Sequence, residues 1–370
     1  MQQYDISNKR ITKGEFAIAF PSAIIGVSVL ELPSEIASVT SYSDGWIPIL
    51  IGGIIFLLFA LLAVHVAKSF PNDSFYTYTS RLLSKPVAGC IVFILIVIAL
   101  FIGSYILRSV AFISQQYLFD KTPMEILALS FLLVVIYAIS GERIGLFRLN
   151  ILFFPIIIFI FIFVGIFIIE WFEYENFLPL LKTDVKGYVN GTVKTFGSYF
   201  GFSIGLFYIY LVKNKDNAYA NVITGLSLTI IFYLYIFFIC IAVFGNLATS
   251  NLHYPTIELA KRVSIPGGIF ERVDAFVFSI WVMAIFNTIS ITLDIALNLL
   301  CSIFKKANKK IISFIFAPII FYVSMFPESL DQLRQFSKYL GVISTSFHCS
   351  VILLLFAVMK VRGVPLREEN

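Results

Sequence analysis

The chain contains 370 residues, of which 59% are hydrophobic and only 13% are charged, and its mean hydropathy is +0.92. Soluble domains carry about 25% charged residues, so this chain lacks the polar surface that a particle of its size needs in water. The composition therefore excludes a soluble enzyme, a secreted disulfide scaffold and a disordered protein. We expect a protein of the lipid bilayer.

Charge and cysteine content add two further expectations. The formal net charge of +5 is better explained by basic residues on cytoplasmic loops than by binding of nucleic acid. The four cysteines, Cys90, Cys240, Cys301 and Cys349, lie in or beside apolar runs and lack the spacing of metal ligands. We interpret them as small hydrophobic side chains, and the sequence predicts neither a metal site nor a cofactor.

Ten segments have the roughly 20 mostly apolar residues that a membrane-spanning helix needs. They lack the period of two residues that marks the strands of a membrane barrel. The predicted fold class is therefore an all-α polytopic membrane protein. In chain order the ten predicted spans are Phe16–Leu32, Trp46–Ala67, Val87–Tyr117, Met124–Ser140, Ile151–Glu170, Gly191–Val212, Ala218–Phe244, Arg272–Phe304, Ile311–Phe326 and Phe336–Val361.

The distribution of basic residues predicts the orientation of these spans. Of the 27 lysines and arginines, 17 fall on the side of the N-terminus, 8 fall on the opposite side, and Arg108 and Lys194 fall inside spans. Basic residues collect on the cytoplasmic side of membrane proteins. We therefore expect a cytoplasmic N-terminal segment (1–15), a transmembrane domain (16–361) and a cytoplasmic tail (362–370).

The ten spans divide into two halves of five, covering residues 16–170 and 191–361. Because each half has an odd number of spans, the second half enters the membrane from the opposite side. This arrangement is an inverted repeat, a plan that is common among secondary transporters. In such folds the first helix of each half is interrupted at the ligand site, so the first and sixth spans should carry matching breaks.

Small residues occur at corresponding places in these two spans, in the segments Gly26–Pro33 and Gly197–Gly205. Glycine and serine let the backbone leave helical geometry, and the freed amide and carbonyl groups can bind a ligand's carboxylate and ammonium. The alternative is that these residues only allow close packing of helices. Because the two segments are paired at matching positions, we favour the ligand site.

The eighth span carries a polar stripe that must face protein or water rather than lipid. Asn287, Ser290, Asp294 and Asn298 fall on one helical face, and Thr288 lies beside it. The stripe either lines a site for a ligand or a cation, or forms hydrogen bonds between helices. We favour the ligand site for Asn287 and Thr288, whereas Ser290 and Asp294 form a possible cation site or a structural stripe.

Two other ionisable residues inside spans keep more than one interpretation. Glu31 lies near the outer end of the first span, and either points into a vestibule or is an interfacial carboxylate. His348 lies in the middle of the tenth span, where a hydrogen-bonded core histidine is more common than a proton relay. The fifth span contains no lysine, histidine or acidic residue before Glu170, which argues against a proton-coupled pump.

Several motifs of this chain resemble the B subunits of spore nutrient germination receptors, the endospore germination permeases of the amino acid–polyamine–organocation superfamily. One departure is Ser28, which stands where the family pattern Gly-x-Gly-x-Leu-x-Leu-Pro has its second glycine. The segments that carry the resemblance are Gly26–Pro33, Asp44–Trp46, Glu175–Leu181 and Glu271–Phe276, followed by Trp281.

The resemblance implies a LeuT-like fold and a nutrient-sensing subunit, not an enzyme, in the spore inner membrane. Such a subunit recognises a small, typically neutral amino acid and signals to a larger membrane A subunit and a lipoprotein C subunit. By position in this fold, the ligand site would be formed by Gly26, Val27, Ser28, Phe101, Tyr105, Gly201, Phe202, Ser203, Asn287 and Thr288. An ion-coupled amino-acid transporter of the same superfamily is the alternative, because fold alone does not determine function.

Overall fold

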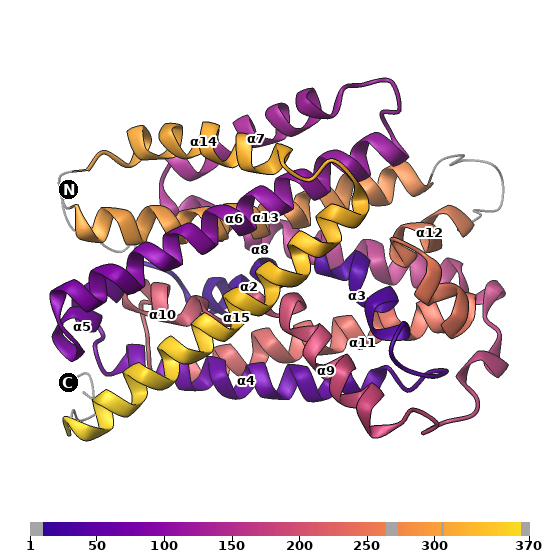
Figure 1. Cartoon of the computed structure of the whole chain (residues 1–370), viewed down its shortest axis with the longest axis horizontal. Helices are drawn as coiled ribbons and strands as arrows, with labels where there is room; N and C mark the ends of the chain where they lie inside the picture. The colour runs from indigo at the N-terminus through magenta and orange to yellow at the C-terminus, as the bar shows by residue number, and fades with distance from the viewer. Residues whose placement is uncertain (1–9, 264–272, 305–306, 364–370) are drawn as a thin grey trace.

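The chain is described here by a computed structural model that covers residues 10–263, 273–304 and 307–363. Within these ranges the chain is almost entirely helical, and its long helices run side by side in one bundle (Figure 1). The first half contains α2 (Lys13–Ile24), α3 (Ser28–Ala37), α4 (Trp46–Lys68), α5 (Phe75–Leu82), α6 (Lys85–Tyr117), α7 (Met124–Ser140) and α8 (Arg143–Phe167).

Two short 3-10 helices, η1 (Ile169–Trp171) and η2 (Tyr174–Phe177), lead into the second half. There α9 is followed by three short pieces that continue along the same span. The elements of this half are α9 (Val185–Ser198), η3 (Phe200–Ile204), α10 (Gly205–Tyr208), η4 (Ile209–Leu211), α11 (Ala218–Asn251), α12 (Pro255–Arg262), α13 (Val273–Ile303), α14 (Lys309–Met325) and α15 (Leu330–Val361).

Among the described residues, six helices are long and apolar enough to cross a membrane, and α2 and α3 together form a seventh candidate that is bent by 54°. The remaining predicted spans correspond to α7 and α14, of 17 residues each, and to the interrupted run from α9 to η4. The chain is therefore a multi-pass membrane protein, as its composition indicates.

The order of elements repeats between the halves. Each half begins with an interrupted helix, and each places a short helix between its second and third long helices: α5 in the first half and α12 in the second. Figure 1 places α5 and the last turns of α15 at one end of the bundle, and α12 toward the other. This is the pattern that two inverted halves produce.

The predicted spans and the observed helices agree closely for α4, α6 and α7, and less well at the ends of α8, α11 and α15. The fourth predicted span coincides with α7, whereas α15 begins at Leu330, six residues before the predicted start at Phe336. The first interruption is shorter than expected: only Ile25–Val27 leave the helix, and the predicted segment up to Pro33 is helical in α3. The predicted start of the eighth span, Arg272, lies outside the described residues.

A fully buried carboxylate joins the two halves. Asp44, just before α4, accepts hydrogen bonds from the amides of Leu181, Lys182 and Thr183 at 2.6–2.8 Å and from the Tyr188 hydroxyl at 3.2 Å. Burial alone would raise the pKa of Asp44, but the amide hydrogen bonds outweigh burial and hold this pKa below its ordinary value. Asp44 thus fixes the segment that enters α9 against the start of α4.

Candidate functional site

The first interruption is held open by α13. The Gly26 amide donates to Thr288 Oγ1 at 3.2 Å, and the Gly26 carbonyl accepts from Trp281 Nε1 at 3.1 Å. Thr288 Oγ1 in turn donates to the Ser22 carbonyl at 2.8 Å. A Cβ atom on residue 26 would lie 2.5 Å from Thr288 Oγ1, so glycine is needed here for close approach of the two helices.

These contacts correct one part of the expectation for the first break. The amide and carbonyl of Gly26 are both bound by α13, so the amide is not free to bind a ligand. Val27 and Ser28 differ, because they stand at the start of α3, where the first amides of a helix lack intrahelical partners. Both residues line the cavity described below.

The second interruption begins at Tyr199, after α9 ends at Ser198, and the chain continues as the 3-10 helix η3. One hydroxyl group connects it to the first break: Tyr233 of α11 lies within hydrogen-bonding distance of the Ile24 carbonyl, at 3.1 Å, and of the Ser198 carbonyl, at 3.0 Å. These are the carbonyls that α2 and α9 leave unpaired at their ends. The two breaks are therefore held side by side.

A cavity of about 360 Å³ opens beside the two breaks. Four helices supply most of its wall: α3, α6, α9 and the first half of α15. Its lining residues are Val27, Ser28, Glu31, Ser34, Glu35, Ser38, Ile102, Tyr105, Ile106, Val193, Lys194, Gly197, Ser198, Phe200, Ser250, Thr288, Arg334, Gln335, Ser337, Lys338, Leu340, Gly341, Val342 and Ser344.

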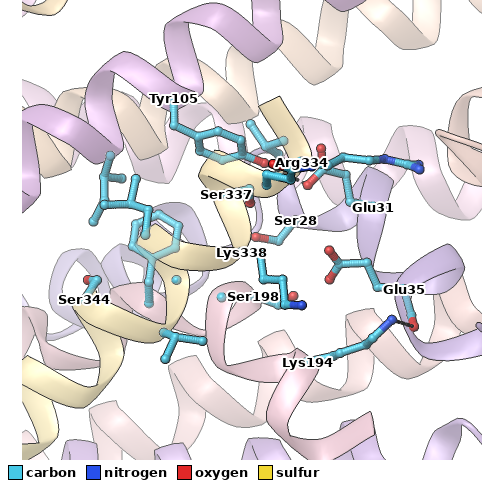
Figure 2. A pocket seen from close by; sticks show the side chains of 18 of the residues that line it. Ser28, Glu31, Glu35, Tyr105, Lys194, Ser198, Arg334, Ser337, Lys338 and Ser344 are labelled. Carbon is cyan, nitrogen blue, oxygen red and sulfur yellow. Dashed lines mark hydrogen bonds between the residues drawn. The ribbon is translucent and has the colours of Figure 1, made fainter. Parts of the chain in front are cut away.

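The charged residues of this wall are separated by sign. Glu31 and Glu35 lie one turn apart on α3, whereas two of the three basic residues, Arg334 and Lys338, lie one turn apart on α15; the third, Lys194, lies on α9. Figure 2 shows both carboxylates extending from α3 toward α15, and Lys338 reaching from α15 into the same space. The Tyr105 hydroxyl of α6 donates to Glu31 Oε2 at 2.7 Å and orients that carboxylate.

The structure brings four of the predicted site residues together on this cavity: Val27, Ser28, Tyr105 and Thr288. Gly26 lies directly behind them, bonded to Thr288. Glu31 also lines the cavity. The sequence alone allowed either a vestibule or an interfacial position for this carboxylate.

Other predicted residues lie elsewhere. Phe101 does not line the cavity; its side chain is 39% exposed on the outside of α6, and its ring lies 6.1 Å from that of Phe336. Phe202 is fully buried and packs on Phe56, with ring centroids 5.1 Å apart. Of the two residues predicted from the third span, Tyr105 lines the cavity and Phe101 does not.

Gly201 and Ser203 line a second, much smaller cavity of about 30 Å³, which also touches His348 and Thr292. Gly201 has a packing role as well, because a Cβ atom there would lie 2.8 Å from Ile24 Cγ1. The His348 side chain bonds within its own helix, where its Nδ1 donates to the Ser344 carbonyl oxygen at 2.7 Å. This contact corresponds to the core interpretation of that histidine.

The polar stripe of α13 separates into two groups. Asn287 and Ser290 are buried, line neither cavity, and have no side-chain hydrogen bond to any described residue. Asp294 is fully buried and paired: its Oδ2 lies 2.5 Å from Arg143 Nε, and its Oδ1 lies 3.1 Å from Lys309 Nζ. Tyr208 also donates to Asp294, at 3.0 Å. Asp294 therefore belongs to an ion-pair cluster that joins α13, α8 and α14.

Sequence reasoning missed several lining residues, above all Glu35, Arg334 and Lys338. Glu35 and Arg334 lie on helical segments, at the end of α3 and the start of α15, that are too polar to be recognised by hydropathy, whereas Lys338 lies inside the tenth predicted span. The signal that marks them is spacing: Glu31 with Glu35, and Arg334 with Lys338, are pairs at i and i+4 on one helix face.

Comparison with solved structures defines the class of the protein. A crystal structure of MhsT in complex with L-phenylalanine matches with a TM-score of 0.68 at 13% sequence identity, over 94% of this chain and 89% of that chain. The chain therefore has the LeuT-like transporter fold with interrupted first and sixth helices, as the two breaks and the two halves indicate.

Comparison of sequences then gives the family. The model of the family described as spore germination protein matches residues 10–333, and the chain belongs to this family of germination permeases. The chain is 39% identical to spore germination protein GerLB of Bacillus cereus, over 98% of this chain and 97% of that protein. It is 25% identical to YndE of Bacillus subtilis strain 168, over 95% of this chain and 97% of that protein.

Proposed function

We propose that the chain is the nutrient-sensing subunit of a spore germination receptor and binds a small, neutral amino acid beside the two breaks. The cavity between α3, α6, α9 and α15 carries this proposal. Its volume of about 360 Å³ lies within the range of small-molecule sites, about 300–1,000 Å³. The lining combines Val27 and Ser28 at the start of α3 with the polar residue Ser198 and the apolar residue Ile102.

The receptor role implies partners and a location. We infer that the subunit acts in the spore inner membrane, with both termini in the cytoplasm, together with a larger membrane A subunit and a lipoprotein C subunit. The excess of basic residues on the N-terminal side supports this orientation. Ligand binding would bias the relative positions of α3 and α9, and this change would be transmitted to the partner subunits.

An ion-coupled amino-acid transporter is the second candidate. The likeness to MhsT, a protein whose structure contains L-phenylalanine, favours it as far as the fold is concerned. Receptor and transporter differ in one measurable property. Both bind the ligand, but only a transporter accumulates the ligand against its concentration gradient.

The test uses the purified full chain in liposomes. Each of the twenty L-amino acids is offered as a radiolabelled probe, first without an ion gradient and then with an inward sodium or proton gradient. We expect saturable binding of at least one amino acid and no gradient-driven accumulation. Accumulation above the equilibrium level would favour the transporter, and absence of binding to every probe would contradict both candidates. Empty liposomes provide the background.

A further inference from the structure

The charges of the cavity identify the chemical class of ligand more sharply than the helix breaks do. We propose that Glu31 is the counter-ion for a cationic amine of the ligand, and that Lys338 faces the ligand's carboxylate. The site would then require a zwitterion. This inference rests on the proposed function, because it assigns the groups that recognise the ligand in the same cavity.

The Glu31 carboxylate is oriented by a hydrogen bond but has no direct cationic partner in the part of the chain that the structure describes. The Tyr105 hydroxyl fixes Glu31 Oε2 at 2.7 Å, and Glu31 is within 4 Å of no basic group among the described side chains. Arg334 is near enough to interact electrostatically with Glu31, yet it forms no ion pair with it. An oriented carboxylate on a cavity wall, without a direct cation, is a preformed acceptor for an ammonium group.

Acidic side chains on α3 face a basic side chain on α15 across the cavity. Glu31 and Glu35 project from one helix, and Lys338 projects from the other without a hydrogen bond to any described residue (Figure 2). Lys194 is committed elsewhere, because its ammonium donates to the Glu35 carbonyl at 3.2 Å and to Ser38 Oγ at 2.7 Å. A zwitterion that lies between the two helices would meet a carboxylate on one side and an ammonium on the other.

Ser198, the last residue of α9, lies near the centre of the view in Figure 2, below Lys338. Ser198 is only 4% exposed and lines the cavity, and its hydroxyl has no hydrogen-bond partner among the described residues. The Ser198 hydroxyl oxygen is not among the fully buried unpaired atoms, so it keeps access to the cavity. This free hydroxyl is therefore a further polar group that a ligand would satisfy.

The test measures binding of matched probes to the purified full chain. The L-amino acid that binds the wild-type chain is compared with the deaminated acid of the same carbon skeleton and with the decarboxylated amine. We expect the deaminated acid to bind at least tenfold more weakly than the amino acid. Glu31→Gln should weaken amino-acid binding at least tenfold, whereas Lys338→Met should weaken it without weakening binding of the decarboxylated amine.

Two further variants separate recognition from folding. Tyr105→Phe keeps the ring and removes the hydrogen bond to Glu31, so it should weaken amino-acid binding several-fold and add little when combined with Glu31→Gln. Glu328→Gln is the matched control, because Glu328 is an exposed acid between α14 and α15 that does not line the cavity. It should bind the amino acid as the wild type does. If Glu31→Gln fails to fold, Tyr105→Phe still tests the role of the carboxylate.

The outcomes distinguish this inference from the proposed function. If the wild-type chain binds an amino acid and the Glu31→Gln variant binds it equally well, the role of Glu31 is overturned while amino-acid sensing stands. Equal binding of the deaminated acid to the wild type would also overturn it. If no amino acid binds the wild type, the proposed function itself fails.

Discussion

Two groups of charges inside the bundle differ in how completely they are paired. At the Asp294 cluster, one carboxylate meets Arg143, Lys309 and Tyr208 at 2.5–3.1 Å and has no exposed surface. At the cavity, Glu31 has only the Tyr105 hydroxyl, and Lys338 has no described partner. Asp294 lies six residues beyond Thr288 on α13, which is about 9 Å along the helix axis.

The difference assigns the two groups different roles. A buried carboxylate that is paired with two cations needs no ligand to balance its charge, so its role is to hold helices together. Oriented but unpaired charges on the wall of a cavity remain available to a molecule that enters. Substitutions in the Asp294 cluster should therefore lower stability, and substitutions on the cavity wall should change ligand binding.

Asp294→Asn should have the largest effect on stability. The change leaves Arg143 and Lys309 beside a neutral side chain in a buried place, and breaking such a pair costs about 3–5 kcal/mol. We expect a large fall in the thermal unfolding temperature of the purified chain in detergent. A variant that unfolds like the wild type but loses ligand or cation binding would instead place Asp294 in a binding site.

Asp44→Asn tests the anchor between the halves. It removes a charged acceptor of three backbone amides, and hydrogen bonds to charged groups contribute about 1.5–3 kcal/mol each. We expect the free energy of unfolding to fall by about 2–3 kcal/mol at neutral pH. Chemical unfolding of the purified chain measures this loss.

The pH dependence of this loss follows from the lowered pKa of Asp44 in the folded chain. The stabilising contribution is complete above about pH 4, the ordinary pKa of an aspartate, and it disappears as the pH falls through the lowered pKa of the folded state. The stability difference between wild type and variant should therefore shrink only in acid. A difference that is independent of pH down to pH 2 would contradict the assignment.

Tyr233→Phe should have a smaller effect on stability. The variant leaves the Ile24 and Ser198 carbonyls without this hydroxyl, and an unsatisfied buried group costs about 1–3 kcal/mol. Because these carbonyls stand at the two breaks, we also expect weaker amino-acid binding. Normal binding in a destabilised variant would show that the breaks keep their geometry without Tyr233. Tyr235→Phe, which removes a hydroxyl of the same helix that bonds to the Phe161 carbonyl, is the control.

Ser28→Gly should have the smallest effect on stability and a selective effect on binding. A glycine in a helix costs at most about 1 kcal/mol relative to alanine, and Ser28 is the first residue of α3. The change restores the glycine of the family pattern and widens the cavity by a hydroxymethyl group. We expect an altered order of preference among amino acids. An unchanged affinity for every amino acid would remove Ser28 from the site.

The fold could be predicted from the sequence largely because lipid-facing helices are uniformly apolar. Met124–Ser140 was predicted to the residue, and the paired small residues located both breaks. The extent of the first break could not be predicted, because Ser28–Pro33 regain helical geometry once Thr288 and Trp281 bind the backbone of Gly26. These partners are more than 250 residues away in the chain.

The site could be predicted only in part, for a physical reason. Hydropathy finds helix segments that face lipid, but Arg334 of α15 and Glu35 of α3 line a cavity and lie on polar segments. A criterion that requires apolar residues excludes these segments. Asp294 is the opposite case. Its place in an apolar span predicts that its carboxylate needs partners, but the sequence does not identify those partners.

The most direct test of the central claim asks whether an amino acid occupies the cavity. Ser198→Cys places a thiol on the cavity wall, and native Cys90, which is exposed and does not line the cavity, serves as the internal control. A small water-soluble methanethiosulfonate modifies both thiols, and peptide mass spectrometry measures each rate with and without the bound amino acid. We predict that the amino acid slows modification at position 198 and leaves Cys90 unchanged. Equal rates at position 198, in a variant that still binds the amino acid, would place the ligand elsewhere.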